Sequence, residues 1–126
     1  MVTEMNPKKN GLISEEQFKN SIREDTFLVS VMLANNEIGV IQPAERISKI
    51  CKSRGITFHS DFAQCLGYIE LDNLLSELNM ITISSHKIYG PKGVGLLLID
   101  EEINLEPLIV GGGQNMVLGP AHYLFL

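Results

Sequence analysis

The sequence predicts an α/β fold, a layered and mostly parallel sheet with flanking helices, and three observations lead to this prediction. First, strand-like segments alternate with segments of helical periodicity over short connections, which is typical of layered α/β proteins with right-handed crossovers. Second, residues 26–34 are β-branched and almost continuously apolar, the pattern of a strand covered on both faces in a parallel sheet. Third, the connection 86–93 is too short to hold a covering helix, so the last strand is predicted to run antiparallel to its neighbour.

A short amphipathic helix is predicted before the first strand. Ser14 and Gln17 have the spacing of a capping box, which satisfies backbone N–H groups at the start of a helix. Phe18 and Ile22 follow on one face, and the helix is expected to end near Asp25.

A second helix is predicted after the first strand. Pro43 suits a first helical turn, and Gly55 suits the position just past the last one. Ile47, Ile50 and Cys51 share one side of this helix, which predicts that this side is buried.

The rest of the chain is predicted to add three strands and one brief helix. The strands are residues 56–61, 80–85 and 93–100, and the brief helix is capped by Asp72 and carries three leucines. The sequence shows no internal repeat or low-complexity segment.

Composition excludes several functional classes. The chain has 126 residues, a formal net charge of −5 and no long basic run, so it lacks the cationic surface that nucleic-acid binding requires. No apolar stretch approaches the roughly 18 residues of a membrane span, and the N-terminus lacks the apolar core of a signal peptide. We therefore expect no membrane association and a cytoplasmic location.

Cys51 and Cys65 have neither CxxC spacing nor a clustered histidine, which predicts buried small hydrophobic residues and no disulfide or metal site.

Polar residues gather where the predicted parallel strands end. Ligands of open α/β sheets bind beyond the carboxyl ends of the strands. The polar residues there are Asn35, Asn36 and Glu37 for the first strand, His59, Asp61 and Gln64 for the second, and Ser84, Ser85, His86 and Lys87 for the third. This set of an amine, a carboxylate, amides, hydroxyls and imidazoles suits a polar planar cofactor with a phosphate better than it suits a hydrolytic site, and no nucleophile elbow is present.

Each of these residues also has an ordinary structural interpretation. A loop lysine is usually a solvated charge. Asp61 and the two asparagines can be turn residues, and either histidine can be half-buried with satisfied hydrogen bonds. Residues 90–95, GPKGVG, resemble a phosphate-binding glycine loop but precede a strand instead of opening a helix. These glycines are predicted to turn the chain and to let the backbone pass close to a neighbour.

Four motifs, taken in order, give the chain a resemblance to a known family. They are MLANNEIGVIQP, HSDFAQCLG, SSHKIYGPKGVG and GGGQ, and they resemble the middle of cysteine desulfurases, pyridoxal-phosphate (PLP) enzymes of the class V aminotransferase group. The resemblance runs from about Gly11 to Gln114. It implies that residues 1–114 form part of the large, PLP-binding domain of a fold-type I PLP-dependent transferase, and that residues 115–126 form a divergent tail.

The resemblance also implies roles for individual residues. Lys87 resembles the catalytic lysine that holds PLP covalently and later acts as a base, and Asp61 resembles the partner of the pyridine nitrogen. The other cofactor-binding residues, by this resemblance, are Asn36 and Gln64 at the ring and its 3-oxygen, and Ser84 and His86 at the phosphate. The implied reaction converts L-cysteine to L-alanine and leaves the sulfur as a persulfide on an enzyme cysteine. A sulfur-acceptor protein then takes it, for iron–sulfur cluster assembly or other sulfur delivery.

Several features of the family have no counterpart in this sequence. The family has an upstream phosphate loop with a histidine stacked on the ring, and a downstream domain with the persulfide cysteine and a substrate-binding arginine; none of these occurs here, and neither Cys51 nor Cys65 matches the persulfide cysteine. The chain is therefore expected to be a central fragment of a homodimeric enzyme, truncated or frame-shifted after Gln114, without desulfurase turnover by itself. Selenocysteine lyase, another class V aminotransferase and a non-catalytic remnant remain open alternatives. Open strand edges and uncovered apolar faces are expected to favour aggregation.

Overall fold

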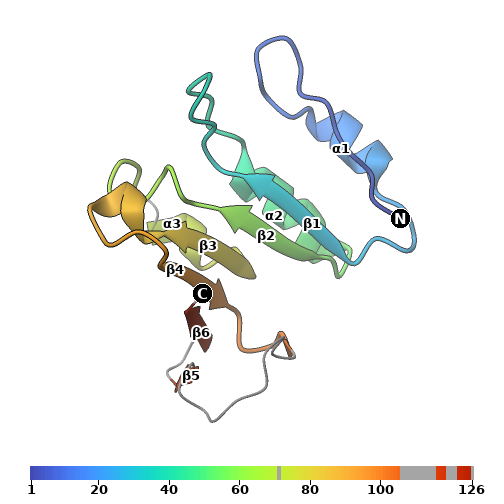
Figure 1. Ribbon diagram of the computed structural model, residues 1–126. Helices are drawn as coiled ribbons and strands as arrows, with labels where there is room; N and C mark the ends of the chain where they lie inside the picture. The colour runs from blue at the N-terminus through green and yellow to red at the C-terminus, as the bar shows by residue number, and fades with distance from the viewer. Residues whose placement is uncertain (71, 106–115, 119–121, 126) are drawn as a thin grey trace.

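The computed structural model describes residues 1–70, 72–105, 116–118 and 122–125 (Figure 1). Helices and strands alternate along most of this length, as the sequence predicts. In chain order the elements are α1 (Glu15–Ser21), β1 (Leu28–Met32), α2 (Ala44–Ser53), β2 (Thr57–Asp61), α3 (Asp72–Leu75), β3 (Met80–Ser84), the 3-10 helix η1 (Ser85–Ile88), β4 (Gly95–Ile99), β5 (Met116–Leu118) and β6 (His122–Phe125).

The described strands form one sheet in the order β1-β2-β3-β4-β6-β5. β1, β2 and β3 are parallel neighbours, and β4 is antiparallel to β3. These four strands confirm the predicted fold class and the predicted reversal of the strand after the short connection. β6 is antiparallel to β4, and β5 is antiparallel to β6. The sequence did not predict these two strands, which fall in the expected tail.

The sheet has one covered face and one open face. On the covered face Phe58, Phe62 and Ile81 belong to the same buried cluster as Ile47 and Cys51 of α2, and none of the five is more than 3% exposed. Side chains alternate along a strand, so the residues between them point the other way. We define the open face by the residues Ser30, Met32, His59, Asp61, Thr82 and Ser84, which the register places on one side and which are half-buried or exposed.

Strand β1 is covered on one face only within the described chain. Leu28 is 43% exposed and Ser30 is exposed, both on the open face. The second covered face that the apolar run 26–34 predicts is therefore not seen, in agreement with the uncovered apolar faces expected of a fragment. The physical reason is that the helices of the described chain lie to one side of the sheet, with α2 and α3 behind it in Figure 1. An apolar run indicates that both sides of a strand are apolar, but it does not indicate what packs against each side.

Helix α1 starts where predicted but lacks the capping box. Ser14 is the N-cap residue, yet its side chain makes no capping hydrogen bond, and the Phe18 N–H donates to the Ser14 carbonyl at 2.8 Å. The helix ends at Ser21, short of the predicted Asp25, because Ile22 is already extended. Its packing is as predicted, since Phe18 is buried and Ile22 packs against the core.

Helix α2 has the predicted end and buried side, and it begins at Ala44, one residue after the Pro43 that was predicted in its first turn. Pro43 is its N-cap residue, and Ile47, Ile50 and Cys51 are buried. Gly55, just past the helix, has φ of +66°, a left-handed conformation that glycine adopts without a steric penalty.

The remaining helices are short. α3 starts at Asp72 itself, so this residue lies in the helix and not at the predicted cap position. Within the described ranges, no helix has the length and apolar character needed to cross a membrane.

Candidate active site

The carboxyl ends of β1, β2 and β3 meet at one edge of the sheet. In the parallel register Met32 pairs with Asp61, and Asp61 pairs with Thr82, so the loops after these strands leave the sheet on the same side (Figure 1). Strand β4 runs the other way, and its first residue, Gly95, pairs with Ser84 at the end of β3. We call this region, residues 33–37, 61–64 and 84–95, the carboxyl edge.

Asp61, the last residue of β2, uses one carboxylate oxygen to form a turn. Its Oδ1 accepts a hydrogen bond from the Ala63 N–H at 2.7 Å, and its carbonyl accepts one from the Leu33 N–H at 3.0 Å. The interpretation of Asp61 as a turn former is thus correct for this oxygen. Its Oδ2 makes no hydrogen bond within the described part of the chain, so one carboxylate oxygen is available to a ligand.

The turn after β3 is built by Ser85, to which the sequence assigned no role. The Ser85 N–H donates to the Val94 carbonyl at 3.1 Å, its carbonyl accepts from the Gly90 N–H at 2.9 Å, and its hydroxyl donates to the Pro91 carbonyl. A Cβ atom on Gly90 would lie 3.0 Å from the Ser85 backbone oxygen. Gly90 is therefore needed for the close approach, which confirms the role predicted for the glycine segment.

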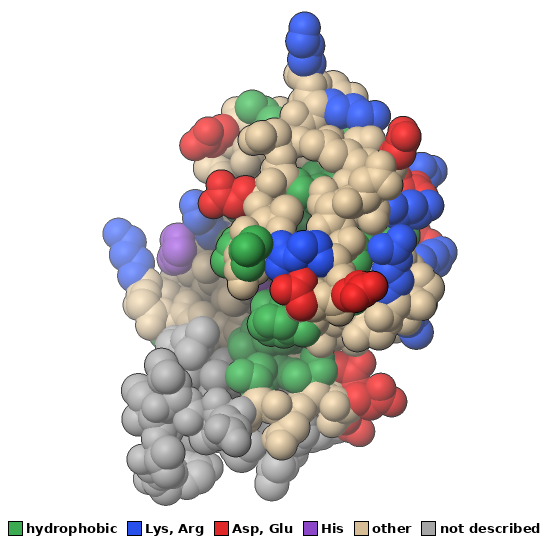
Figure 2. All heavy atoms as spheres, turned by 90° about the vertical axis from the view of Figure 1, so that its right-hand side faces the viewer, with side chains coloured by type: hydrophobic (Ala, Val, Ile, Leu, Met, Phe, Trp, Pro, Cys, Tyr) green, Lys and Arg blue, Asp and Glu red, His purple; other side chains and the backbone are tan. Residues whose placement is uncertain are grey.

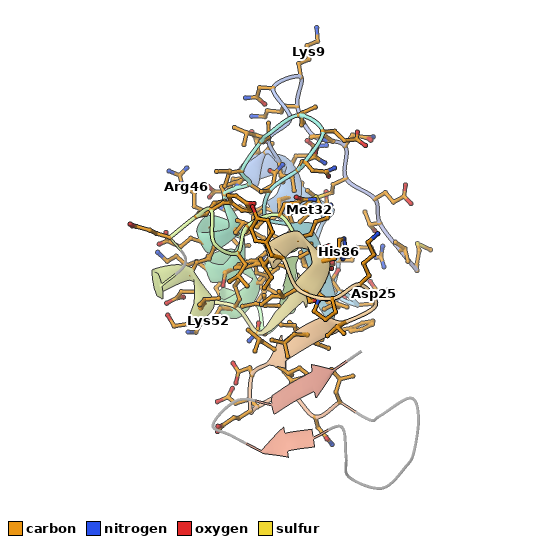
Figure 3. The ribbon with its side chains drawn as sticks, turned by 60° about the vertical axis from the view of Figure 1, so that its left-hand side comes forward. Lys9, Asp25, Met32, Arg46, Lys52 and His86 are labelled. Carbon is orange, nitrogen blue, oxygen red and sulfur yellow. The ribbon has the colours of Figure 1, made fainter. Side chains whose placement is uncertain are left out.

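This turn carries Ser84, His86 and Lys87. Ser84 is the half-buried last residue of β3, and His86 and Lys87 are exposed on η1, where Figure 3 labels His86. None of these three side chains makes a hydrogen bond within the described part of the chain. The turn therefore holds its backbone in place through Ser85 and presents its other polar groups at the carboxyl edge.

The loop after β1 gives its two asparagines different environments. Asn35 Oδ1 accepts hydrogen bonds from the Glu37 N–H at 3.0 Å and the Ile38 N–H at 3.1 Å, so Asn35 is a turn residue. Asn36 is exposed, and Gln64 after β2 is half-buried. Among the residues that the structure describes, neither side chain of this second pair has a hydrogen-bond partner, and both amides are available to a ligand.

His59 lies inside β2 and not beyond its end, and both of its ring nitrogens are engaged. Nδ1 lies 2.8 Å from Ser30 Oγ on β1, and Nε2 is hydrogen-bonded to Thr82 Oγ1 on β3. Burial lowers the pKa of the imidazole from its usual 6.5, and the Asp61 carboxylate opposes this shift. His59 is therefore a neutral, half-buried histidine near pH 7, which agrees with its ordinary interpretation. The sequence alone did not identify its two partners.

Both cysteines are buried and protonated. Cys51 and Cys65 are 0% exposed and unpaired. Burial raises the pKa of the Cys51 thiol to about 11, and burial also raises the pKa of Cys65, with a further contribution from the Asp61 carboxylate. The thiolate is the nucleophilic form of cysteine, so neither residue is suited to act as a nucleophile near neutral pH. Their prediction as buried small hydrophobic residues is confirmed.

Two hollows on the described surface lie away from the carboxyl edge. One is lined by α1 and α2 and includes Lys19, Arg46, Lys49 and Arg54. The other is lined by the N-terminal segment and the start of α2. Lys and Arg side chains gather toward the right-hand side of Figure 2, with Asp and Glu among them. Neither hollow includes a carboxyl-edge residue, and the charged groups around the first one are partly paired with each other, as in Glu45–Lys49 at 2.5 Å.

Comparison with known sequences identifies related proteins. The profile of class-V aminotransferases matches residues 1–124. The chain is 49% identical over 115 residues to the cysteine desulfurase IscS of Rickettsia rickettsii (strain Iowa), a match that covers 90% of this chain and 28% of that protein. It is 50% identical over 115 residues to the mitosomal cysteine desulfurase of Trachipleistophora hominis, with 90% of this chain and 26% of that protein covered.

Solved structures share the same fold. A structure described as SspA in complex with cysteine matches with a TM-score of 0.81 and 42% identity, over 90% of this chain and 33% of that one. The apo structure of cysteine desulfurase from Thermococcus onnurineus NA1 matches with a TM-score of 0.75 and 29% identity, over 90% of this chain and 28% of that one. The chain thus spans about a quarter to a third of the length of these relatives. The resemblance to cysteine desulfurases seen in the four motifs is confirmed, and the chain belongs to the class-V aminotransferase family.

Proposed function

We propose that this chain supplies the PLP-binding segment of a cysteine desulfurase, with Lys87 as its catalytic lysine. The observation that carries the proposal is the register of the sheet, in which Asp61 ends β2 and the turn with Lys87 follows β3, the parallel neighbour of β2. The two groups therefore belong to loops that leave adjacent strands at one edge. We assign residues 1–114 to this segment and residues 115–126 to a tail.

The free groups at the carboxyl edge fit PLP. The cofactor offers an aldehyde, a ring nitrogen, a phenolic oxygen and a phosphate, and each needs a different partner. The chain offers the Lys87 amine, Asp61 Oδ2, the Asn36 and Gln64 amides, the Ser84 hydroxyl and the His86 imidazole. None of these groups is occupied by a hydrogen bond within the described residues, as expected for groups that serve a ligand.

Each side chain would have a distinct task at such a site. When bound, PLP serves as an electron sink for the negative charge that develops on the substrate α-carbon. The Lys87 amine in its neutral form would hold the cofactor and, after release, would serve as the base that moves the proton on the substrate Cα. The Asp61 carboxylate would favour the protonated ring nitrogen, because an adjacent negative charge stabilises the cation. Ser84 and His86 would donate hydrogen bonds to the phosphate.

We propose L-cysteine as the substrate and L-alanine as the organic product. The carbon–sulfur bond of the substrate breaks, and the sulfur joins an enzyme thiol as a persulfide while the carbon gains a proton, so that no external oxidant or reductant is required. Cys51 and Cys65 do not fit the accepting thiol, because both are buried and protonated. In support, one structural relative is described in complex with cysteine.

The proposal extends to the setting of the enzyme. We expect the working desulfurase to be a cytoplasmic homodimer that passes sulfur to an acceptor protein, for iron–sulfur cluster assembly or other sulfur delivery. The names of the curated relatives, cysteine desulfurase IscS and a mitosomal cysteine desulfurase, support this choice of activity.

The proposal is tested by covalent capture of the cofactor. The purified chain is incubated with PLP and reduced with borohydride, and the pyridoxyl label is mapped by peptide mass spectrometry. We expect the label on Lys87, and we expect it to disappear in Lys87→Ala. Lys92→Ala is the matched control, because Lys92 is an exposed lysine of the same turn region. Equal labelling of both lysines, or a label that persists elsewhere at the same level in Lys87→Ala, would count against the proposed function and favour a non-catalytic remnant.

A further inference from the structure

One histidine bridges all three parallel strands on the open face of the sheet. His59 on β2 has Ser30 Oγ of β1 at 2.8 Å from its Nδ1, and its Nε2 is hydrogen-bonded to Thr82 Oγ1 of β3. Ser30 lies directly opposite His59 in the register, whereas the residue opposite His59 on β3 is Met80. The bridge therefore runs straight across to β1 and diagonally forward to β3, toward the carboxyl edge.

The hydrogen bond from His59 to β3 reaches Thr82, which lies between the two proposed cofactor-binding residues, Asp61 and Lys87. Thr82 is the register partner of Asp61, and its carbonyl accepts a hydrogen bond from the Phe62 N–H at 2.8 Å. The turn that carries Lys87 follows Thr82 closely, at the end of the same strand. A shift of β3 relative to β2 at this point would therefore move Lys87 relative to Asp61.

A side-chain hydrogen bond contributes more to holding the strands together on the open face than on the covered face. On the covered face the strands are held by packing against α2. Ser60 also links strands there, since its hydroxyl donates to the Val31 carbonyl at 2.8 Å, but this link reaches only β1. The contact between His59 and Thr82 is the only hydrogen bond from side chain to side chain between β2 and β3 in the described ranges.

We propose that His59 is a positioning residue that holds Thr82 and thereby fixes the placement of the Lys87 turn relative to Asp61. The inference rests on the proposed function, because it concerns the same two groups, and it adds a residue whose two ring nitrogens are engaged by the protein itself. A neutral imidazole suits the task. One ring nitrogen donates and the other accepts, and a hydroxyl can serve either nitrogen. A neutral ring also leaves the Asp61 carboxylate free of a competing positive charge.

The two halves of the bridge supply a matched pair of variants. Thr82→Val keeps a similar shape and removes the hydrogen bond to β3. Ser30→Ala removes the hydrogen bond to β1 and leaves the link between β2 and β3 intact. Each variant loses one hydrogen bond of His59, so a general loss of stability affects both. A positioning role predicts an asymmetry, in which only Thr82→Val disturbs the carboxyl edge.

The first measurement is amide hydrogen exchange in the PLP-free chain. The reporters are the Phe62 N–H, bonded to the Thr82 carbonyl, and the Ser85 N–H, bonded to the Val94 carbonyl. We expect both amides to exchange about tenfold faster in Thr82→Val, the size of effect that one lost hydrogen bond produces, and less than about twofold faster in Ser30→Ala. Equal acceleration in the two variants, or none in either, would overturn the bridge whether or not the chain binds PLP.

The second measurement is the ratio of pyridoxyl label on Lys87 to label on Lys92. We expect this ratio to fall about tenfold in Thr82→Val and to stay within about twofold of the unaltered chain in Ser30→Ala. A purely structural role would lower the melting temperature of both variants and leave the ratio unchanged, and that result would overturn positioning. If the unaltered chain is not labelled preferentially on Lys87, the proposed function fails. The difference in amide exchange between Thr82→Val and Ser30→Ala then decides alone whether His59 holds the carboxyl edge in place.

Discussion

At the carboxyl edge, neighbouring residues of the same type have different roles. Asn35 closes its loop through two hydrogen bonds from backbone N–H groups, whereas Asn36 is exposed. Ser85 builds the turn after β3 with its N–H, carbonyl and hydroxyl, whereas the Ser84 hydroxyl has no partner in the described chain. In each pair one residue satisfies the backbone and the other presents its side chain at the edge. The local backbone therefore decides which residue of each pair keeps a side chain available to a ligand.

The buried thiol of Cys51 gives a prediction for a single residue. Because burial raises the pKa of Cys51 to about 11 from the usual 9.0, its thiolate forms at higher pH in the folded chain than in the unfolded chain. We expect the rate of iodoacetamide alkylation at Cys51, followed by peptide mass spectrometry, to rise with a midpoint near pH 11 in the folded chain. At pH 8 the rate should be lower than in urea by about a hundredfold, the ratio of the two thiolate fractions.

The urea-unfolded chain is the control for this measurement, and its midpoint should lie near pH 9, the ordinary thiol value. A folded chain whose Cys51 reacts with the same midpoint would show that the thiol is accessible and unshifted. That result would also reopen the possibility that one of the chain's own cysteines accepts sulfur.

At the scale of the element, periodicity predicted most of the architecture. The buried side of α2, the three parallel strands and the reversed β4 follow from local pattern and from the length of a connection. The capping box at Ser14 did not form, because a cap depends on side-chain rotamers that spacing does not determine. The pairing of β6 with β4 was not predicted either, since it depends on which strand edge is available in three dimensions.

The sequence predicted that Asp61 and Lys87 lie at one edge of the sheet, because they follow two parallel strands, and four motifs indicated the family. It did not predict the hydrogen bonds that hold this edge. The bridge made by His59 was missed because its partners are found only when the register is known. A faint signal was present, since Ser30, His59 and Thr82 are polar residues that each lie inside one of three predicted strands, and aligning those strands would have brought them to one face.

The turn after β3 gives a prediction for an element. In Gly90→Ala the new Cβ would lie 3.0 Å from the Cβ, O and Oγ atoms of Ser85, and we expect the free energy of unfolding, from urea titration, to fall by about 1–3 kcal/mol as in other overpacked sites. The Ser85 amide should also exchange faster. Gly67→Ala serves as a control for backbone strain alone, because Gly67 has φ of +83° and no atom within 4 Å of an added Cβ.

The two variants separate steric crowding from backbone strain. Adding Ser85→Gly removes two of the three crowded atoms, so we expect it to recover part of the loss in Gly90→Ala and none of the loss in Gly67→Ala. If Ser85→Gly rescues neither variant, the close approach between Ser85 and Gly90 does not hold the turn.

At the scale of the whole molecule, two of the proposed cofactor-binding residues lie on the open face of the sheet, which also carries exposed apolar side chains. The open face carries Asp61 and Ser84 near its carboxyl edge and the apolar Met32 beside them. Figure 2, which views the molecule from its α1 and β1 side, shows hydrophobic side chains that reach the surface between charged ones. β1 is also the end strand of the described sheet, so the backbone groups on its outer side have no strand partner there. Exposed strand edges with apolar side chains pair readily with other chains.

A charge at the start of β1 tests whether this surface drives self-association. Leu28 begins the strand, lies on the open face and is 43% exposed, so Leu28→Lys adds an edge charge that opposes strand pairing without breaking the core. We expect the weight-average mass in sedimentation to fall toward that of a single chain, with the melting temperature within about 3 °C of the unaltered protein, as for surface substitutions. Leu33→Lys is the matched control, because Leu33 is 2% exposed in the core cluster and a buried lysine should abolish cooperative unfolding. If Leu28→Lys associates as strongly as the unaltered chain at every protein concentration, β1 and the open face are not the surface through which the chains meet.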